Sequence, residues 1–450
     1  MPAKIGERIA ILGIGYVGLV TAATFLKRGH NVVCVDVLKD RVAMINDGKS
    51  PIFEPGLEEE LEQGIRSGRL MATTDGITAA RCSKFIFICV GTPSMPDGSI
   101  DLKFIRSASK DIGKGLKGRK GFPVVVMKST VVPNTCEKVV RPIIEKASKM
   151  RAGRGFGLAC NPEFLKEGEA LKDSLHPDRI VIGGTDDRSR SAVEGLYKGM
   201  DAPLILTDLN TAEMIKYASN AFLAVRVGLS NEIANICSAH GVDVYEVMKG
   251  VGLDKRIGPH FLRAGAGFGG SCFPKDLKAL RAAAEKAEVS LNILPSVLDQ
   301  NEAQPLETIK LLKKVLKGLK GRRIALLGLA FKPDTDDVRE TRALPIVKAL
   351  LKEGAVVRLY DTNRAAMDNF RTFIKGKTKR VIECGSIEEA LKGSDGAIIQ
   401  TESKEFKALR PRDIKAWMRR PVIIDGRRTL DPHLMKRSGI VYRGIGWKNR

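Results

Sequence analysis

A glycine-rich turn near the start of the chain constrains the fold more than any other feature. Residues 8–15, RIAILGIG, form an apolar run that ends in glycine, and residues 16–30, YVGLVTAATFLKRGH, have the pattern of a helix. Gly13, Gly15 and Gly18 follow the spacing G-x-G-x-x-G across this junction. The first glycine permits a tight turn, the second lets a pyrophosphate approach the backbone, and the third lets the helix pack on the strand. The motif therefore predicts a dinucleotide site whose phosphates meet the unpaired N–H groups at the helix N-terminus.

An acidic residue follows the glycine motif at the distance at which such a residue distinguishes NAD from NADP. The run NVVCVDV is predicted as a second strand, and it ends near Asp36, 18 residues after Gly18. A carboxylate here binds both ribose hydroxyls and repels a 2′-phosphate, so NAD is favoured over NADP as the cofactor. The nearby cation of Arg41 weakens this preference slightly.

Four further apolar runs are predicted to continue the same parallel sheet: KFIFICVGTP, PVVVMKST, FGLACNPEF and RIVIGG. Each ends in small or polar residues, which is typical of strands whose carboxyl ends face a ligand in a doubly wound sheet. Thr92 and Thr130 are therefore candidates to line the cofactor crevice, although ordinary turn chemistry would also explain them.

The pattern changes at about Asp208. Residues 210–241 have the pattern of one long helix, with Asn210 or Thr211 as the predicted N-cap. This length exceeds that of a typical globular helix, so we expect the helix to join two domains. More helices are predicted up to about Lys317.

The opening pattern then recurs in a weaker form. The runs RRIALLG, GAVVRLYD, DGAIIQTES and PVIIDGRR predict four more strands, with Gly328 in the place of the first glycine and Asp361 at the end of the second strand. The loop after the first of these strands carries Lys332 and Arg339 instead of further glycines. Such a loop suits a nucleotide that is held by cationic side chains.

The predicted fold class is α/β, with two Rossmann-like doubly wound parallel-sheet domains joined by a long central helix and a helical middle domain. Residues 1–207 would bind NAD, residues 208–317 would form the central helical domain, and residues 318–450 would bind the second nucleotide. Two such sheets imply a cleft that holds two nucleotide-like ligands.

Composition excludes several other classes of protein. Of the 450 residues 43% are hydrophobic, which is enough for sizeable cores, and no run approaches the roughly 18 apolar residues of a membrane span. The eight cysteines stand singly, without C-x-x-C or zinc-like spacing to histidine, which argues against a disulfide framework or a structural metal. Cys34 and Cys89 lie in apolar runs and are predicted as small core residues. The N-terminal segment lacks a signal-peptide pattern, so a cytoplasmic protein without a membrane partner is expected.

The net charge of +23, from 75 basic and 52 acidic residues, raises the alternative of a nucleic-acid partner. The basic residues are scattered, however, and stretches such as KVLKGLKGRR lack interleaved aromatic residues. We therefore predict no nucleic-acid partner and a solvated basic surface that attracts anionic ligands such as phosphates.

The run GFGGSCFPKD, residues 267–276, presents a cysteine after a glycine-rich segment. The thiol of Cys272 could be a nucleophile, a metal ligand, half of a disulfide or a small core residue. The glycines allow a ligand to approach closely, and Lys275 and the N–H groups of a following helix can stabilise a thiolate. Asp276 lies one turn further and could order a water. A nucleophilic thiol beside a nicotinamide suits aldehyde oxidation through a thiohemiacetal and a thioester that water hydrolyses.

Two other pairs share the i, i+4 spacing of Cys272 and Asp276, which would place both members on one face if the segment is locally helical. Lys216 and Asn220 lie in EMIKYASNAF, which is otherwise mostly apolar and small, and Glu163 and Glu167 lie in NPEFLKEGEA. A solvated helix face would explain the first pair, and acids at a helix start would explain the second.

A resemblance to known proteins rests on motifs that occur in family order along nearly the whole chain: GIGYVGLV, VGTPSMPDGSID, KSTVVP, NPEFLKEGEA, HPDRIVIGG, EMIKYASNAF, RIGPHFLRAGAGFGGSCFPKD, FKPDTDDVRET and DGRR. With these motifs the chain resembles the nucleotide-sugar dehydrogenases of the UDP-glucose/GDP-mannose dehydrogenase family. The resemblance implies two successive NAD-linked oxidations of an alcohol to a carboxylate, which turn UDP-glucose into UDP-glucuronate. GDP-mannose or a UDP-N-acetylhexosamine is the alternative substrate.

The resemblance also implies the site residues. Those with catalytic roles are Cys272, Lys216, Asn220, Asp276, Glu167 and Thr130. Those that contact the cofactor are Gly13, Gly15, Val17, Gly18, Asp36, Arg41, Thr92, Thr130, Glu167, Lys275 and Arg339. Those that contact the substrate are Glu163, Phe164, Leu165, Lys166, Glu167, Lys216, Asn220, Arg256, Phe261, Leu262, Arg263, Ala264, Gly265, Gly269, Lys332 and Arg427. No metal is implied, because a thiol and NAD perform the oxidation.

Specific roles follow from the same resemblance. Cys272 matches the nucleophile and Asp276 the acid that assists hydrolysis. Lys216 and Asn220 match the residues that stabilise the oxyanion and position water, and Glu167 matches an active-site residue linked to Thr130 through water.

Other residues of the resemblance bear on assembly and on substrate. Arg256 resembles an arginine that reaches the substrate of a neighbouring subunit, which implies a homodimer built on the long helix. Ser271 stands where branches acting on N-acetylated sugars often carry histidine, which favours UDP-glucose. Asn134 and Thr135 stand where a Gly-Thr is common.

Two functions of other classes stay open beside this one. A two-electron dehydrogenase would keep the glycine motif and would form no thioester on Cys272. A basic nucleic-acid-binding protein with a vestigial nucleotide fold would bind in a salt-sensitive way and would reduce no NAD.

Overall fold

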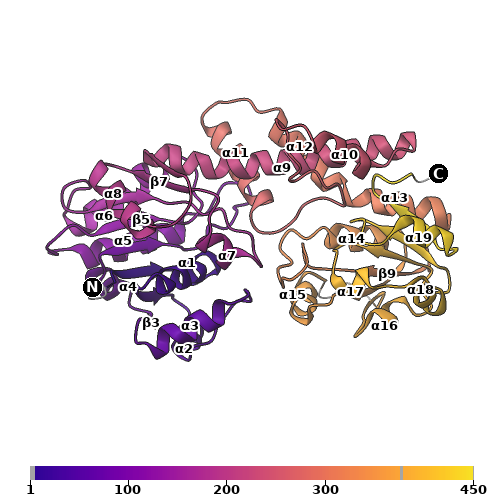
Figure 1. Ribbon diagram of the computed structural model, residues 1–450, viewed down its shortest axis with the longest axis horizontal. Coiled ribbons are helices and arrows are strands. Elements are labelled where there is room, and N and C mark those ends of the chain that lie inside the picture. Colours follow the sequence, from indigo (N-terminus) through magenta and orange to yellow (C-terminus); the bar gives the residue numbers. More distant parts are fainter. Residues whose placement is uncertain (1–5, 375–378, 449–450) are drawn as a thin grey trace. The chain divides into compact units, whose positions relative to one another are not determined.

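The computed structural model describes residues 6–374 and 379–448, which form two compact units (Figure 1). The first unit contains residues 6–219 and Lys278–Lys286, and the second contains Asn220–Leu277 and the described residues from Ala287 onward. Both consist of a mostly or wholly parallel sheet with helices, so the predicted α/β class with two doubly wound sheets and a helical central region is confirmed. No helix in the described parts of the chain is long and apolar enough to cross a membrane.

The first unit is built on an eight-stranded sheet with the order β3-β2-β1-β4-β5-β6-β7-β8. Its strands are β1 (Arg8–Leu12), β2 (Asn31–Val35), β3 (Leu70–Thr73), β4 (Phe85–Ile88), β5 (Val124–Met127), β6 (Gly157–Cys160), β7 (Ile180–Gly184) and β8 (Leu204–Thr207). Its helices are α1 (Tyr16–Lys27), α2 (Lys39–Asn46), α3 (Leu57–Arg66), α4 (Gly76–Cys82), α5 (Lys103–Leu116), the π-helical turn η1 (Cys136–Val140), α6 (Arg141–Ser148), α7 (Ala170–Leu175) and α8 (Asp187–Tyr197).

The core of this unit lies on both faces of the sheet, because successive side chains of a strand point to opposite faces. Ile9 and Ile11 pack with residues of α1, α3 and α8, whereas Ala10 and Leu12 pack with residues of α4, α5 and α6. This two-sided burial explains why the central strands are continuous apolar runs. Cys34 and Cys89 are buried in the same core, as predicted.

The second unit is built on a six-stranded sheet with the order β11-β10-β9-β12-β13-β14, in which every pairing is parallel. Its strands are β9 (Arg323–Leu327), β10 (Val356–Tyr360), β11 (Val381–Glu383), β12 (Gly396–Ile399), β13 (Val422–Asp425) and β14 (Val441–Gly444). The helices that lie within it are α10 (Val244–Gly252), α12 (Ile293–Ala303), α13 (Pro305–Leu316), α14 (Ala343–Lys352), α15 (Arg364–Ile374), α16 (Ile387–Leu391), α17 (Lys404–Lys407), α18 (Pro411–Trp417) and α19 (Pro432–Arg437).

The two sheets repeat the same turn after their first strand, as the recurring sequence pattern predicts. Gly13 follows β1 with φ +98°, and Gly328 follows β9 with φ +93°. The N–H of each glycine donates to the last residue of the second strand of its sheet, over 2.8 Å to the carbonyl oxygens of Val35 and Tyr360. Only glycine adopts such a conformation without strain, so both positions require it.

Two helices contain residues of both units, and both belong to the predicted site: α9 (Leu209–His240) and α11 (Phe273–Lys286). The predicted N-cap of the long helix is wrong, because α9 begins at Leu209. Asp208 occupies the capping position, and its Oδ1 accepts a hydrogen bond from the N–H of Thr211 over 2.9 Å. Asn210 and Thr211 therefore lie in the first turn. The last helix before the second sheet, α13, ends at Leu316, near the predicted end of the central helices at Lys317.

The direction predicted for RIVIGG is also wrong. β7 pairs with β6 in an antiparallel sense, with Cys160 opposite Gly183, although β8 then pairs with β7 in parallel. The segment after β6 does not cross back to the other end of the sheet. Asn161 instead hydrogen-bonds the carbonyl oxygen of Val181 over 2.8 Å, so β7 starts beside the end of β6 and must run in the opposite direction.

The helix–strand packing at Gly18 gives a test of the turn. A Cβ at Gly18 would stand 1.9 Å from the carbonyl oxygen of Gly13, whereas a Cβ at Gly15 would meet no atom within 4 Å. We expect Gly18→Ala to lower the free energy of unfolding by about 1–3 kcal/mol, because α1 must move off β1. Gly15→Ala is the matched control and should unfold near the wild-type temperature in a thermal scan. Equal melting temperatures for the two variants would contradict this packing.

Candidate active site

The glycine motif forms the turn between β1 and α1 and leaves room for a ligand. A Cβ at Gly13 would stand 2.7 Å from the carbonyl oxygen of Cys89, so this glycine serves the close approach of two strands. Gly15 precedes α1 without a side-chain cap on the helix, and the space beside it is open. An open position next to uncapped helical N–H groups fits a pyrophosphate.

Asp36 directly follows β2 and is held against the same turn. Its Oδ2 accepts a hydrogen bond from the N–H of Ile14 over 3.1 Å, and its Oδ1 accepts one from Leu38 over 3.0 Å. The carboxylate is thus fixed where the ribose of a dinucleotide lies in such folds. Val17 lies in the first turn of α1, and Arg41 lies in α2, the helix after Asp36.

Thr92 and Thr130 follow two neighbouring strands. Thr92 lies beyond the end of β4 and Thr130 beyond the end of β5, and β4 pairs with both β1 and β5 in parallel. Both threonines are therefore at the carboxyl edge of the sheet, next to the point between β1 and β4 where the strand order reverses. Ligands bind at this point in doubly wound sheets.

The loop after β6 carries Glu167 and is attached to the glycine turn. The N–H of Gly168 donates to the hydroxyl of Tyr16 and to Oε2 of Glu54, each over 2.7 Å, and the Tyr16 hydroxyl donates to Glu54. Glu54 is buried, and its other oxygen accepts from the N–H of Leu171 over 3.2 Å. Sequence reasoning missed Tyr16 and Glu54. The tyrosine inside the glycine motif was a signal that a buried hydroxyl needed a partner, but nothing in the sequence identified Glu54.

Lys216 and Glu163 form a buried ion pair. Nζ of Lys216 lies 3.0 Å from Oε1 of Glu163, and the two side chains are only 5% and 8% exposed. Burial opposes the ionisation of Glu163, but the charges of Lys216 and Lys128 and the N–H of Leu165 outweigh it and hold the pKa of Glu163 below its usual value. The cation predicted on the apolar helix therefore has a carboxylate partner inside the protein.

A second buried lysine lies beside this pair. Lys128, at the end of β5, donates from Nζ to Oδ1 of Asn161 over 2.8 Å, and Tyr197 donates to the same oxygen over 2.5 Å. Burial lowers the pKa of Lys128 to about 8. Lys128 and Asn161 lie in the motifs KSTVVP and NPEFLKEGEA, but the sequence alone assigned a role to neither.

A pocket opens beside these groups in the first unit. Phe164 lines it, and the guanidinium of Arg179 stacks on the Phe164 ring, 3.7 Å from its centroid. Leu165 lines it as well, whereas Lys166 is exposed and pairs with Asp173 over 3.5 Å. The loop predicted to contact substrate therefore forms one wall of a pocket that also contains Lys128 and Glu163.

Cys272 directly precedes α11 in the second unit, and it is exposed. Its carbonyl oxygen accepts the first helical hydrogen bond from the N–H of Asp276 over 2.8 Å. The Asp276 side chain is 2% exposed and lies between two donors, because Asn220 donates to its Oδ2 over 2.6 Å and Lys275 donates to its Oδ1. The structure thus brings Asn220 and Asp276, which are distant in sequence, into one hydrogen-bonded group next to the exposed thiol.

The predicted substrate residues before the cysteine belong to the same unit. Arg263 forms a two-point pair with Glu402 over 2.9 and 3.0 Å, and the N–H of Gly265 donates to Oδ1 of Asn231 over 2.8 Å. Arg427, which follows β13, donates to the carbonyl oxygens of Gly267 over 2.6 Å and of Gln400 over 3.0 Å. Arg427 therefore holds the glycine-rich segment, and its contact with a substrate stays a prediction.

Three further cations that were predicted to contact the cofactor or the substrate lie on loops of the second unit. Lys332 and Arg339 belong to the loop between β9 and α14, where Nζ of Lys332 lies 5.6 Å from the centroid of Phe331 and Arg339 pairs with Asp337 over 2.7 Å. Arg256 is on the surface and pairs with Asp254 over 2.6 Å. Within residues 6–374 and 379–448, no group of three or more His, Cys, Asp or Glu side chains could hold a metal ion.

Comparison with known proteins gives matches along the whole chain. Residues 7–201 match the NAD binding domain of the UDP-glucose/GDP-mannose dehydrogenase family, residues 210–303 match its central domain, and residues 325–432 match its UDP binding domain. UDP-glucose 6-dehydrogenase TuaD of Bacillus subtilis is 41% identical over 98% of this chain and 93% of its own length. UDP-glucose 6-dehydrogenase AglM of Haloferax volcanii is 42% identical over 97% and 99%. The structure of a UDP-glucose dehydrogenase from Pyrobaculum islandicum matches with a TM-score of 0.90, at 39% identity and over 99% of both chains.

The buried pair of Lys216 and Glu163 gives a test that depends on pH. Glu163→Gln leaves a buried cation without its carboxylate, so we expect a loss of about 3–5 kcal/mol in the free energy of unfolding at pH 7. Because the folded-state pKa of Glu163 is depressed, its stabilisation is present above the usual carboxyl pKa and is lost as pH falls through the folded value. Urea titrations of wild type and variant should therefore differ most at neutral pH and converge in acid. Glu59→Gln, at an exposed position of α3, is the control, and a pH-independent difference for Glu163→Gln would contradict the pairing.

Proposed function

Because this chain belongs to the UDP-glucose/GDP-mannose dehydrogenase family, we propose that it oxidises C6 of UDP-glucose from an alcohol to a carboxylate in two steps. The protein is an NAD-dependent oxidoreductase, and the product of the proposed reaction is UDP-glucuronate. The observation that carries the proposal is the exposed Cys272 at the start of α11, one turn before a buried Asp276 that Asn220 and Lys275 hold. A simple two-electron dehydrogenase needs no such thiol.

The glycine turn and Asp36 fit NAD. The open position at Gly15 admits the pyrophosphate, and the carboxylate of Asp36 is oriented to accept the ribose hydroxyls. When bound, NAD accepts a hydride from C6 in each of the two oxidations. Thr92, Thr130 and Glu167 act around it at the carboxyl edge of the sheet, and the other cofactor contacts of the sequence analysis stay predictions.

Cys272 is the nucleophile of the second oxidation. The first oxidation removes a hydride and a proton from the alcohol and leaves an aldehyde. The thiolate then adds to the aldehyde carbon, and loss of a second hydride from the thiohemiacetal gives a thioester. Water attacks the thioester carbonyl, and the C–S bond breaks to return the thiolate and release the carboxylate. Asp276 and Asn220, which share a hydrogen bond, orient this water.

Lys216 stabilises the negative charge that develops on the C6 oxygen. Its ammonium is buried and its direction is set by Glu163, so it is organised before the charge appears. A cation held in a site from which water is excluded stabilises an alkoxide or a tetrahedral oxyanion more strongly than one in water. The nearby Lys128 adds a second positive charge close to Glu163.

The second unit is proposed to bind the nucleotide part of the substrate. Residues 325–432 match the UDP binding domain of the UDP-glucose/GDP-mannose dehydrogenase family, which supports a nucleotide-sugar substrate. Lys332 on the loop after β9 suits the diphosphate. Ser271 is a small residue next to the thiol, with its Oγ 3.6 Å from Sγ of Cys272, which leaves the position near C6 without the bulk of a histidine.

The family matches support the proposed division into residues 1–207, 208–317 and 318–450, because the three matched ranges fall within these limits. We also propose a cytoplasmic location. All eight cysteines carry free thiols, which suits a reducing compartment.

The stoichiometry of NADH tests the proposed reaction. Wild-type protein should form two NADH for each UDP-glucose consumed, whereas a two-electron dehydrogenase would form one. Cys272→Ser should release no UDP-glucuronate, because a hydroxyl forms no thioester that water can hydrolyse readily. Cys82→Ser, which changes an exposed cysteine of α4, is the matched control and should keep both NADH. Full carboxylate release by Cys272→Ser would overturn the nucleophile, and a panel of UDP- and GDP-sugars would rank the substrates.

A stripe on α9 supports a homodimer. Phe222, Leu229 and Ile236 are spaced by seven residues, which places them on one face of the helix, and they are 75%, 54% and 54% exposed. Large exposed apolar residues in a row are costly in water unless another surface covers them. We propose that a second copy of this chain covers the stripe, with the exposed Arg256 directed to the substrate of that copy.

A charged residue placed in the apolar stripe of α9 should separate the two subunits of the proposed dimer. We expect Leu229→Glu to convert a dimer into a monomer, because two carboxylates would be buried against apolar side chains. The molar mass from light scattering after size-exclusion chromatography measures this directly. Val289→Glu is the control, since Val289 is 53% exposed and lies outside the stripe. A wild-type monomer, or a Leu229→Glu dimer, would contradict the proposal.

A further inference from the structure

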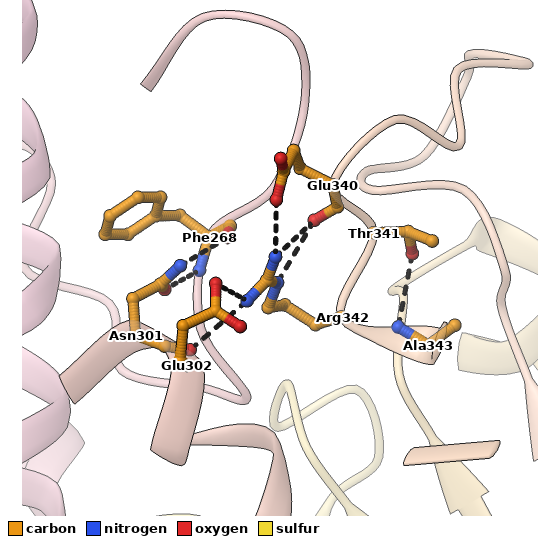
Figure 2. Close-up of polar contacts among 7 residues, drawn as sticks. All are labelled: Phe268, Asn301, Glu302, Glu340, Thr341, Arg342 and Ala343. Atoms are coloured by element: carbon orange, nitrogen blue, oxygen red, sulfur yellow. Dashed lines mark hydrogen bonds and ion pairs between the residues drawn. The ribbon is translucent and has the colours of Figure 1, made fainter. Parts of the chain in front are cut away.

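The glycine-rich segment that leads to Cys272 is held by a buried asparagine. The N–H of Phe268 donates to Oδ1 of Asn301 over 2.7 Å, and Nδ2 of Asn301 donates to the carbonyl oxygen of Phe268 over 3.0 Å (Figure 2). The asparagine side chain thus pairs with both polar groups of one residue, as a neighbouring strand would do. Asn301 is 1% exposed and lies near the end of α12, so the helix fixes its position.

A buried arginine ties the same helix end to the loop after β9. Arg342 is 3% exposed, and its NH1 donates to Oε1 of Glu302 over 3.0 Å and to the carbonyl oxygen of Asn301 over 3.4 Å. Its Nε and NH2 donate to the carbonyl oxygen of Glu340 over 3.1 and 2.9 Å (Figure 2). A guanidinium presents five N–H donors in a fixed plane, so it sets the spacing of the two elements that it joins.

The far end of this loop is also fixed to its own beginning, just after β9. The hydroxyl of Thr341 donates to the carbonyl oxygen of Leu329 over 2.6 Å. The same hydroxyl accepts from the N–H of Ala343 over 3.2 Å (Figure 2). Residues 340–343 are therefore held in place by hydrogen bonds between β9 and α14. From this segment the side chain of Arg342 reaches Glu302 of α12.

The glycine segment lies against these groups without spare room. A Cβ at Gly267 would stand 2.8 Å from Oδ1 of Asn301, and a Cβ at Gly269 would stand 2.5 Å from the carbonyl oxygen of Glu340. The N–H of Gly270 donates to the carbonyl oxygen of Arg339 over 3.0 Å. The backbone two to five residues before Cys272 is thus in direct contact with α12 and with the loop after β9.

We propose that Asn301 and Arg342 are positioning residues, which together fix the segment 267–270 and thereby place the Cys272 thiol for attack on the aldehyde. Neither side chain needs to touch the substrate. The loop between β9 and α14, which contains Arg342, also carries Lys332 and Arg339. A ligand bound by those two cations would therefore further restrict the movement of residues 267–270. The inference rests on the proposed role of Cys272 as nucleophile.

The reaction itself separates a positioning role from a merely structural one. The first oxidation yields an aldehyde and needs no thiol, whereas the second requires Cys272. Asn301→Ala and Arg342→Met should therefore slow the second hydride transfer and leave the first near its wild-type rate. A displacement of a reacting group by about 1 Å costs on the order of 10²-fold in rate, so we expect the second step to slow about 10- to 100-fold.

The measurement is the time course of NADH under single-turnover conditions, in which the two oxidations give two phases. Asn301→Asp keeps the size and the acceptor but loses the donor to Phe268, and Arg342→Lys keeps the charge but loses the planar fork. Both should show smaller losses in the second phase than Asn301→Ala and Arg342→Met. If Asn301→Ala does not fold, the second phase of Asn301→Asp decides. Phe370→Leu in the core of α15 is the stability control and should leave the ratio of the two rates unchanged.

The outcomes distinguish this inference from the proposed function. If Cys272→Ser still releases UDP-glucuronate, the nucleophile assignment is wrong and the inference falls with it. If Cys272→Ser stops after one NADH but Asn301→Ala and Arg342→Met keep a wild-type second phase, the positioning role is wrong and the proposed function stands. Equal slowing of both phases would also overturn the positioning role, because it would show a general loss of the site.

Discussion

The close approach of backbone to backbone at a few glycines is the constraint on which the rest of the site depends. At Gly18 the carbonyl oxygen of Gly13 occupies the place of a Cβ, and this contact sets the angle at which α1 leaves β1. At Gly269 the carbonyl oxygen of Glu340 does the same for the segment before Cys272. In each unit a side chain would push apart the two elements that frame the chemistry. The cofactor turn and the thiol segment are therefore built by the same device, the removal of a Cβ where two chains must touch.

The sequence predicts the central strands well because burial on both faces leaves a continuous apolar run. RIAIL and its counterpart in β9, RIALL, each have four buried residues in a row. The outer strands carry no such signal. In β8 the residues Leu204, Ile205 and Leu206 are all partly exposed, and β11 has three residues, none of them fully buried. Strand direction is also absent from the pattern, since an apolar run reads alike in both senses, and only the path of the chain after Asn161 reverses β7.

Pairs within one helix could be predicted, and pairs between distant segments could not. Spacing alone places Lys216 and Asn220 on one face of α9. The N-cap could not be chosen from the sequence alone, because Asp208, Asn210 and Thr211 are all suitable residue types. The hydrogen bond from the N–H of Thr211 identifies Asp208 as the cap. The partners of these residues come from elsewhere. A lysine in an apolar helix indicates that a carboxylate must lie near it, because a buried charge without a partner is strongly unfavourable. The sequence does not say which carboxylate. Glu163, which follows β6, becomes the partner because the fold of the first unit brings it to the N-terminal part of α9.

Residues that act by holding backbone are the least visible in a sequence. Asn301 binds the N–H and the carbonyl oxygen of Phe268. Every residue except proline has both groups, so the residue type at position 268 does not reveal that its backbone is bound. Arg342 likewise directs most of its donors to carbonyl oxygens. Such residues are detectable only as buried polar side chains whose partners are main-chain atoms of a functional segment. The same criterion applies to Glu54, whose oxygens accept from the N–H groups of Gly168 and Leu171 beside Glu167. Two loops with proposed catalytic residues are thus held in place through their backbones by buried polar side chains.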